Sequence, residues 1–373
     1  MKQDHHNQPT RLIFNIITFR FLLFFLCIYF FLVGIHSLSK SFTLFTGPFA
    51  QSLFAEIKNP FVGFCVGVLA TALMQSSSAT NSIAITMVSA QIISLTQVIP
   101  IIMGANIGTT VTNSMLALTR IKHHYSFERA FAASTVHDFF NILTACILFP
   151  LEIKFHFIEK ASLWFFHMFV GNGISLQNDF KSPIKIAIDQ TTNYIHRILE
   201  FYPILYLFIS MLLVLLMLIF ILKILKNTFL TRLKANLNTT IFQTPLTAWS
   251  TGALFTFIVQ SSSITTSLII PLAIEDVLTL EQIYPYTVGA NFGTGITTFL
   301  AALSLNRVAF VAAIAALIFD IIGTCIIYPM PIIGSIPLWF AKNLGKSVRK
   351  YKIISILYLL LFFILIPLII VLF

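Results

Sequence analysis

The chain has 373 residues, of which 57% are hydrophobic and only 10% are charged. Soluble globular proteins have about 25% charged residues, so this composition excludes an ordinary soluble domain and indicates a polytopic membrane protein. The net charge of +10 does not indicate nucleic-acid binding, because the basic residues fall between apolar segments, where positive-inside topology accounts for them. The four cysteines lie within apolar runs, which favours small buried residues over a disulfide framework or a metal cluster.

The first apolar segment is predicted at residues 12–37, after a polar stretch that we expect in the cytoplasm. A signal peptide is the alternative for residues 21–35, but no small-residue cleavage site follows them. Residues 60–74 and 79–90 are each too short to cross a bilayer, which needs about 20 residues. Two half-length helices on either side of a serine cluster predict a re-entrant hairpin, whose exposed backbone is tolerated where it lines a polar cavity.

Residues 94–118 are long enough to span the membrane but contain a glycine-rich run, which predicts a broken helix. A further span is expected at about 130–150, after a basic loop. Residues 152–200 mix charged and aromatic side chains, which is typical of an interfacial segment.

The second half of the chain repeats these elements in the same order. We expect an apolar span at 204–222, half-helices at 246–259 and 264–274, a broken helix at 282–303 and a further span at 308–330. A basic stretch then precedes a last span at 353–373.

A duplicated motif organises the whole chain. Gln75–Ser82 reads QSSSATNS and Gln260–Ser267 reads QSSSITTS, so the two share six of eight residues at an offset of 185. Gly104–Thr109 (GANIGT) and Gly289–Thr294 (GANFGT) recur at the same offset. Matched blocks in a fixed register indicate an internal duplication.

The number of crossings predicts the orientation of the two copies. If the hairpins do not cross the membrane, each half crosses three times, and an odd number turns the second copy upside down. With the N-terminus in the cytoplasm, the predicted cytoplasmic segments hold 15 of the 23 Lys and Arg residues, which supports this inversion and an outside C-terminus. These 15 are Lys2, Arg11, Arg20, Arg120, Lys122, Arg129, Lys223, Lys226, Arg232, Lys234, Lys342, Lys346, Arg349, Lys350 and Lys352.

The predicted organisation is therefore an all-α polytopic membrane protein built as an inverted-topology repeat, with two re-entrant hairpins and broken helices. We expect a first repeat at 1–155, an interfacial linker at 156–200, a second, inverted repeat at 201–331, and a basic segment with the final span at 332–373. The expected location is the cell membrane, with the lipid bilayer as partner. The oligomeric state does not follow from the sequence.

The serine runs are candidate anion sites. A serine run followed by a helix start offers hydroxyl donors and unpaired backbone N–H groups at the positive end of a helix dipole. Two such tips facing each other could surround a tetrahedral oxyanion. The candidate anion-binding residues are Ser76, Ser77, Ser78, Ser261, Ser262 and Ser263.

Neutral oxygens in and around the same motifs are candidate cation ligands, because hard cations prefer oxygen. The candidate sodium-binding residues are Gln75, Thr80, Asn106, Thr109, Gln260, Thr265, Asn291 and Thr294. The alternative is that small polar residues only pack helices together, as they often do in membranes. For an isolated serine that alternative is preferable, but not for a run of three with a glutamine, duplicated in register.

Two acidic residues lie within predicted spans, where an acid is a functional candidate by default. Asp138 is the candidate ion or proton site, and its neighbour His137 is either its partner or a structural histidine. Asp320 occupies the place of Asn141 in the first copy, so a helix-packing hydrogen bond accounts for it at least as well as ion binding.

These motifs resemble the type II sodium-dependent phosphate cotransporters and their bacterial relatives. The matching stretches are Gln75–Ser78, Ile102–Thr109, Arg129–Ala132 with Thr135–Asn141, Pro150–Glu152, Gln260–Ser263 and Tyr284–Pro285. The resemblance implies sodium-driven uptake of inorganic phosphate, with both QSSS runs at the substrate and sodium sites and no cofactor besides the coupling ion Na⁺.

The chain departs from that family in three ways. It has no histidine at Ala316, it is short between the halves, and no acidic residue directly follows Leu118, where some relatives carry one linked to electrogenic transport. The sodium stoichiometry therefore stays open.

The expected function is a sodium-coupled phosphate symporter that works by alternating access, and not an enzyme. A proton-coupled or other-oxyanion symporter with Asp138 as the titrating group is the nearest alternative, and a passive anion channel is another. An intramembrane serine hydrolase could use Ser77 and His137, but it needs one activated serine and gives no reason for a duplicated motif.

Overall fold

The computed structural model describes residues 8–44, 59–170, 183–225 and 241–372, and all regular secondary structure within those ranges is helical. Among the described residues, five segments are long and apolar enough to cross a membrane: Leu22–Ser41, Leu95–Leu118, His124–Phe155, Arg307–Ile327 and Ile353–Leu372. The prediction of an all-α polytopic membrane protein is confirmed.

The first half contains the predicted hairpin and broken helix. Its elements are α1 (Gln8–Thr43), α3 (Pro60–Met74), α4 (Ser77–Ser89), α5 (Leu95–Gly108), α6 (Val111–Leu118) and α7 (His124–Phe155). Local signals set where these helices start: Asn59 caps α3 ahead of Pro60, and Ser94 forms a capping box with Gln97 at the start of α5.

The second half repeats these starting signals. Its elements are α10 (Pro203–Leu225), α12 (Pro245–Val259), α13 (Ser262–Ser267), α14 (Ile270–Ile274), α15 (Leu280–Ala302) and α16 (Arg307–Ile327). Thr244 caps α12 ahead of Pro245, and Thr279 forms a capping box with Gln282 at the start of α15.

Further helices follow each half. They are α8 (Phe157–Val170), α9 (Pro183–Leu199), α17 (Pro331–Lys350), α18 (Ile353–Leu360) and α19 (Ile366–Leu372), the last two joined by a π-helical turn at Leu361–Leu365. The sequence predicted only a basic stretch where α17 lies. That helix has an apolar stripe against α7 and basic residues in its last turn, so its average composition hides its helical pattern.

Glycines bring two helix pairs into backbone contact at matching positions. A Cβ atom on Gly104 of α5 would lie 2.0 Å from the carbonyl oxygen of Phe64 on α3, and one on Gly289 of α15 would lie 1.9 Å from that of Trp249 on α12. No side chain fits at either place. The glycine motifs at offset 185 therefore allow the first helix of each hairpin to pack closely against the helix that follows the hairpin.

One predicted break is absent. The first repeat breaks at Thr109–Thr110, between α5 and α6, but α15 runs from Leu280 to Ala302 without interruption, so the prediction of a broken helix at 282–303 was wrong. Gly289 and Gly293 serve close approach to α12 and leave the backbone of α15 helical, so glycines in this motif do not by themselves break a helix. In the second repeat the interruption lies instead in the hairpin, at Leu268–Ile269 between α13 and α14.

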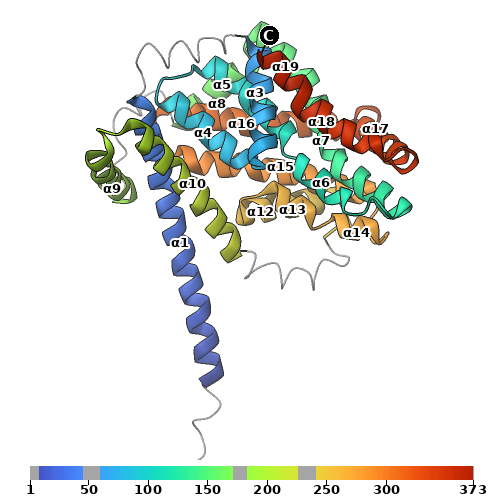
Figure 1. Ribbon diagram of the computed structural model, residues 1–373, viewed down its shortest axis with the longest axis horizontal. Coiled ribbons are helices and arrows are strands. Elements are labelled where there is room, and N and C mark those ends of the chain that lie inside the picture. The colour runs from blue at the N-terminus through green and yellow to red at the C-terminus, as the bar shows by residue number, and fades with distance from the viewer. Residues whose placement is uncertain (1–7, 45–58, 171–182, 226–240, 373) are drawn as a thin grey trace, which may run out of the picture.

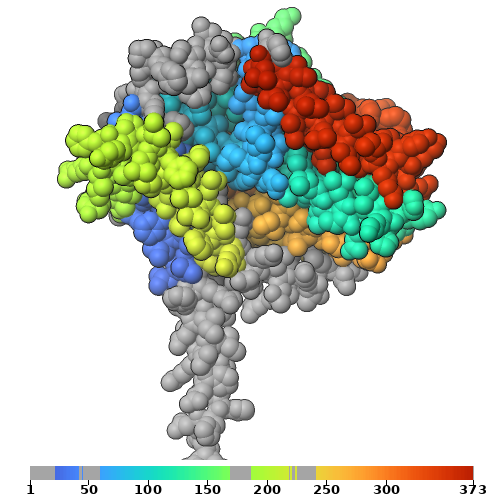
Figure 2. Space-filling view, viewed as in Figure 1, coloured from blue at the N-terminus to red at the C-terminus, as the bar shows by residue number. Residues whose placement is uncertain are grey.

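The hairpins lie in the middle of the molecule. Figure 1 shows α3–α4 and α12–α13 there, with α1 and α10 at one side and α17–α19 at the other. Helix α1 packs against α10, α7 against α17, and α16 against α8. Figure 2 shows the C-terminal helices on the outside of the molecule, where large apolar side chains such as Leu357, Leu361 and Ile366 are exposed, as expected of a surface that faces lipid.

Candidate functional site

The two hairpin tips have the same backbone conformation. Gln75 ends α3 at φ 54° and ψ 29°, and Gln260 ends α12 at φ 55° and ψ 29°. A side chain other than glycine rarely adopts this left-handed region, so its recurrence at offset 185 marks a shared, specified turn. Each glutamine ends the first helix of its hairpin, and the second helix begins two residues later, at Ser77 or Ser262.

The first serine of each run caps the helix that follows. The Ser76 hydroxyl accepts a hydrogen bond from the Ala79 N–H at 3.2 Å, and the Ser261 hydroxyl accepts one from the Ile264 N–H at 3.3 Å. Ser76 and Ser261 are half-buried, whereas the next two serines of each run are buried. Each run thus has one serine engaged in capping and two placed inside the protein.

The tips reach across to the other half of the chain. The Ser78 hydroxyl donates to the carbonyl oxygen of Gln260 at 3.4 Å, and the Ser263 hydroxyl donates to the carbonyl oxygen of Thr109 at 3.4 Å. The amide of Asn113 on α6 donates to the Thr266 hydroxyl at 2.6 Å. The structure therefore brings both serine runs and the break between α5 and α6 together.

Four threonines of the predicted cation set make matched contacts. Thr80 and Thr265 donate to the carbonyls of the capping serines of their own tips, at 3.1 and 2.9 Å. Thr109 and Thr294 donate in the same way to Ala105 and Ala290, at 3.2 and 3.4 Å. Each hydroxyl proton is used within its own helix, so each oxygen keeps lone pairs with which it could ligate a cation.

The two predicted asparagines meet at one carboxylate. The side-chain amide of Asn106 donates to Oδ1 of Asp320 at 3.1 Å, and that of Asn291 donates to the same oxygen at 2.7 Å. All three side chains are buried. A carboxyl group between two amides from different repeats is an acidic group that the two motifs themselves lack.

Asn141 completes this network. Its Nδ2 donates to the carbonyl oxygen of Asn106 at 2.9 Å, and its Oδ1 accepts from Asn291 at 2.9 Å. His137 Nε2 lies 3.3 Å from the same Asn141 amide. Asn141 and Asp320 occupy equivalent places after a phenylalanine in the two repeats, and that equivalence was the sequence signal for the network, although neither residue was assigned to the site.

Asp138 lies apart from these residues. It is fully buried, and its Oδ2 accepts a hydrogen bond from the hydroxyl of Tyr358 on α18 at 2.9 Å. Its Oδ1 has no hydrogen-bond partner within the described ranges. His137 contacts Asn141, whereas Asp138 contacts Tyr358, so the structure does not pair the neighbouring histidine and aspartate.

The two glutamines differ in their surroundings. Gln75 is exposed, with its amide 3.6 Å from the sulfur of Met115, whereas Gln260 is buried, and its Oε1 has no partner among the described residues. Thr71 and Thr256, one turn before each tip, also have buried hydroxyls without a described partner. Polar atoms of this kind call for a ligand or water, because native proteins rarely leave them unsatisfied.

Comparison with known proteins assigns the chain to a family. The sequence model described as Na+/Pi-cotransporter matches residues 30–173 and 213–363. Sodium-dependent phosphate transport protein 2B of Homo sapiens is 32% identical over 438 aligned positions, which cover 91% of this chain and 63% of that protein. Protein 2A of Ovis aries is 32% identical over 419 positions, covering 91% of this chain and 65% of that protein.

The chain spans slightly less than two thirds of the length of these curated relatives. No solved structure matches it significantly. The two stretches matched by the family model include both serine runs, both glycine motifs and the helices that carry Asn141 and Asp320. The chain belongs to the Na+/Pi-cotransporter family.

Proposed function

We propose that this protein is a sodium-coupled symporter that imports inorganic phosphate by alternating access across the cell membrane. The observation that carries the proposal is the meeting of the two duplicated serine tips at a buried polar centre between the repeats. Membership of a family whose similar relatives are named sodium-dependent phosphate transport proteins supports the choice of cargo.

Phosphate is proposed to bind at the serine tips. Ser77 and Ser78 begin α4, a helix of 13 residues whose first N–H groups and positive dipole end favour an anion. Ser262 and Ser263 add hydroxyl donors from the other repeat, with Ser76 and Ser261 at the edge. Hydroxyl and backbone donors suit a tetrahedral oxyanion, which accepts several hydrogen bonds at once.

Sodium is proposed to bind beside these tips through neutral oxygens, from Gln75, Thr80 and Thr109 in the first repeat and Gln260, Thr265 and Thr294 in the second. Asn106 and Asn291 connect these positions to the Asp320 carboxylate. A negative charge in a low-dielectric interior stabilises a nearby cation, and a bound cation in turn offsets the cost of burying phosphate. Sodium thereby becomes a requirement for phosphate binding.

Alternating access is supported by differences between the two repeats. The first repeat has an exposed Gln75 and a break between α5 and α6, whereas the second has a buried Gln260 and a continuous α15. Transporters built from inverted repeats change access when the two repeats exchange such conformations around a fixed site.

We propose an inverted arrangement, which fits the positions of the loops, with a cytoplasmic N-terminus that rests on the charge distribution of the sequence alone. Glu128 near the start of α7 bonds Arg349 at the end of α17, so the two basic segments predicted as cytoplasmic lie at one face. Helix α7 has 32 residues and is about 48 Å long, and its other end lies next to α8. His167 of α8 contacts Arg307 at the start of α16, which places the Asn306 loop at that second face.

The test is uptake of labelled phosphate into proteoliposomes that contain the purified protein. An inward sodium gradient should concentrate phosphate inside the vesicles, and sodium at equal concentration on both sides should only equilibrate it. Uptake that follows a proton gradient without sodium would indicate the proton-coupled alternative. Rapid equilibration with no accumulation under any gradient would indicate an anion channel.

A further inference from the structure

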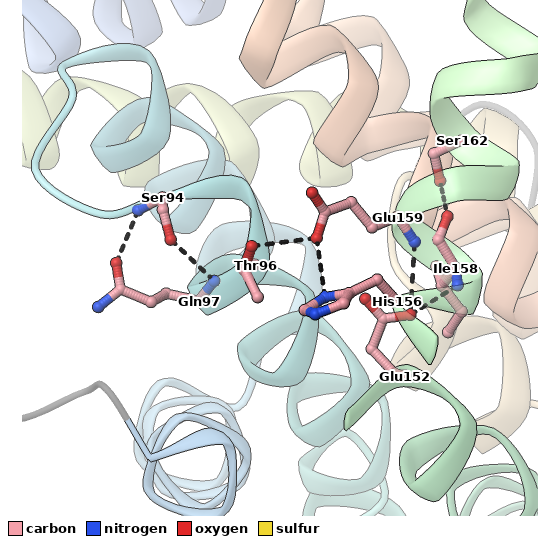
Figure 3. A network of polar contacts seen from close by, with 8 residues as sticks. All are labelled: Ser94, Thr96, Gln97, Glu152, His156, Ile158, Glu159 and Ser162. Atoms are coloured by element: carbon pink, nitrogen blue, oxygen red, sulfur yellow. Dashed lines mark hydrogen bonds and ion pairs between the residues drawn. The ribbon is translucent and has the colours of Figure 1, made fainter. Parts of the chain in front are cut away.

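A second polar cluster lies where α7 ends and α8 begins, away from the serine tips. Figure 3 shows Glu152, His156 and Glu159 there, together with Thr96 at the start of α5. One ligand atom from each of the three titratable residues lies within 4.8 Å of the other two. The transport mechanism proposed above uses none of these side chains.

Glu152 is the buried member of this cluster, with only 2% of its surface exposed. Its Oε2 accepts hydrogen bonds from the N–H groups of Ile158 at 2.6 Å and Glu159 at 3.4 Å, at the start of α8. Its Oε1 is buried and has no hydrogen-bond partner within the described ranges. In Figure 3 the free oxygen lies on the side of the His156 ring. A half-satisfied buried carboxylate is costly unless a cation or donor completes it.

His156 and Glu159 supply the remaining ligands. Oε2 of Glu159 lies 3.3 Å from Nδ1 of His156 and accepts a hydrogen bond from the Thr96 hydroxyl at 3.0 Å. The Thr96 contact orients the carboxylate, as outer hydrogen bonds do at metal centres. The His156 side chain is 47% exposed and that of Glu159 is 22% exposed, which leaves a route from solvent to the buried oxygen of Glu152.

We propose that Glu152, His156 and Glu159 form a binding site for a divalent transition-metal ion of the Zn²⁺ class. Imidazole nitrogen and carboxylate oxygen are both zinc ligands, and open zinc sites have three protein ligands with water in the fourth position. Zinc binds such atoms at about 2.0–2.2 Å, so tetrahedral ligands lie about 3.4 Å apart. The three atoms, all within 4.8 Å, need only a small movement of exposed side chains to reach that geometry.

The nitrogen in the set favours Zn²⁺ over Mg²⁺ and Ca²⁺, which prefer oxygen alone. Binding would replace the His156–Glu159 ion pair and would satisfy the free oxygen of Glu152. It would also tie together the end of α7 and the start of α5, the two helices that carry Asn141 and Asn106. The site is independent of the proposed phosphate cargo.

The test is Zn²⁺ titration of the purified full-length protein after EDTA treatment, with Co²⁺ absorbance as a second readout. His156→Ala is the main variant, and His124→Ala is the matched control, because His124 is an exposed histidine at the opposite end of α7. The wild type and His124→Ala should show a visible Co²⁺ band of low-symmetry coordination and a zinc site that His156→Ala loses or binds at least tenfold more weakly.

Glu152→Gln tests whether weaker zinc binding could come from misfolding. Glutamine keeps an oxygen that accepts from the Ile158 N–H, and it removes only the charge. It should weaken zinc binding with an unchanged melting temperature in the absence of metal. Zinc should also raise the melting temperature of the wild type but not of His156→Ala. Equal zinc affinity and stoichiometry in the wild type and His156→Ala, or no zinc binding by the wild type, would overturn the proposal.

Discussion

The amide of Asn106 in the first repeat donates a hydrogen bond to the carboxylate of Asp320 in the second, 214 residues later in the chain, at 3.1 Å. Asn291, the repeat partner of Asn106, donates to the same oxygen at 2.7 Å. One buried acceptor thus joins the two copies of the glycine motif. Side chains from equivalent positions in the two copies therefore share one hydrogen-bond partner.

Replacement of Asp320 by Asn should weaken sodium dependence more than phosphate recognition. Asparagine keeps an oxygen that can accept from Asn106, but it removes the negative charge that stabilises a nearby cation. The sodium concentration for half-maximal uptake should rise about tenfold or more, because loss of about 1.4 kcal/mol of charge stabilisation corresponds to a factor of ten in affinity. Uptake measured against sodium at saturating phosphate gives this value. An unchanged sodium dependence would show that Asp320 does not contribute to sodium binding.

Ser77→Ala and Ser262→Ala should each reduce phosphate uptake strongly, because both hydroxyls lie at buried tips in matching places. Loss of one hydrogen bond to an anion costs about 1.5–3 kcal/mol, or roughly 10- to 100-fold in affinity. Ser304→Ala is the control, since that buried hydroxyl lies just after the end of α15 and bonds the Ala301 carbonyl there. Wild-type transport by either tip variant at normal surface levels would show that the two repeats do not share one site.

Gly104→Ala and Gly289→Ala should destabilise the protein by about 1–3 kcal/mol or more, because each added Cβ meets a backbone carbonyl at about half the normal contact distance. Gly34→Ala is the milder control, since its Cβ would first meet a side chain of Val214 at 3.1 Å. Thermal unfolding in detergent provides the comparison. Equal melting temperatures for all three variants would contradict the close approach of α3 to α5 and α12 to α15.

Single cysteines at His124 and Asn306 should be labelled from opposite sides of the membrane. The background lacks Cys27, Cys65, Cys146 and Cys325, and both positions are exposed at helix starts. This expectation rests on the predicted three crossings in each half, which would invert the second repeat. Labelling of both positions by an impermeant reagent on one side of sealed vesicles would contradict the inverted topology.

The helix boundaries near the site could be predicted because the signals are local. Pro60 and Pro245 follow capping residues at helix starts, and the serine after each tip glutamine caps the next helix. The pairing of the two serine runs followed from their fixed offset. The residues of both repeats that meet there were therefore accessible from the sequence.

Tertiary contacts were not accessible in the same way. Nothing local shows that Asp320 accepts from Asn106 or that Tyr358 bonds Asp138, since these partners are more than 200 residues apart. The continuous course of α15 was missed because a glycine-rich run can mark either a break or a close helix contact, and the sequence does not distinguish the two. Parts of the predicted polar N-terminal stretch, of the interfacial linker and of the basic segment with Lys226, Arg232 and Lys234 lie outside the described residues.

The central claim is that sodium supplies the positive charge that the serine tips lack. Across Gln75–Ser82 and Gln260–Ser267 there is no Lys or Arg, and a helix end contributes only about half a charge, so hydroxyl groups alone should not hold a phosphate dianion. The dependence must be reciprocal, because coupling between two ligands is one free energy.

Isothermal titration of phosphate into the purified protein, in sodium chloride and in choline chloride at equal ionic strength, tests this claim most directly. Phosphate affinity should be about 5- to 150-fold lower in choline, and phosphate should tighten sodium binding by the same factor. Equal phosphate affinity in the two salts would contradict the mechanism.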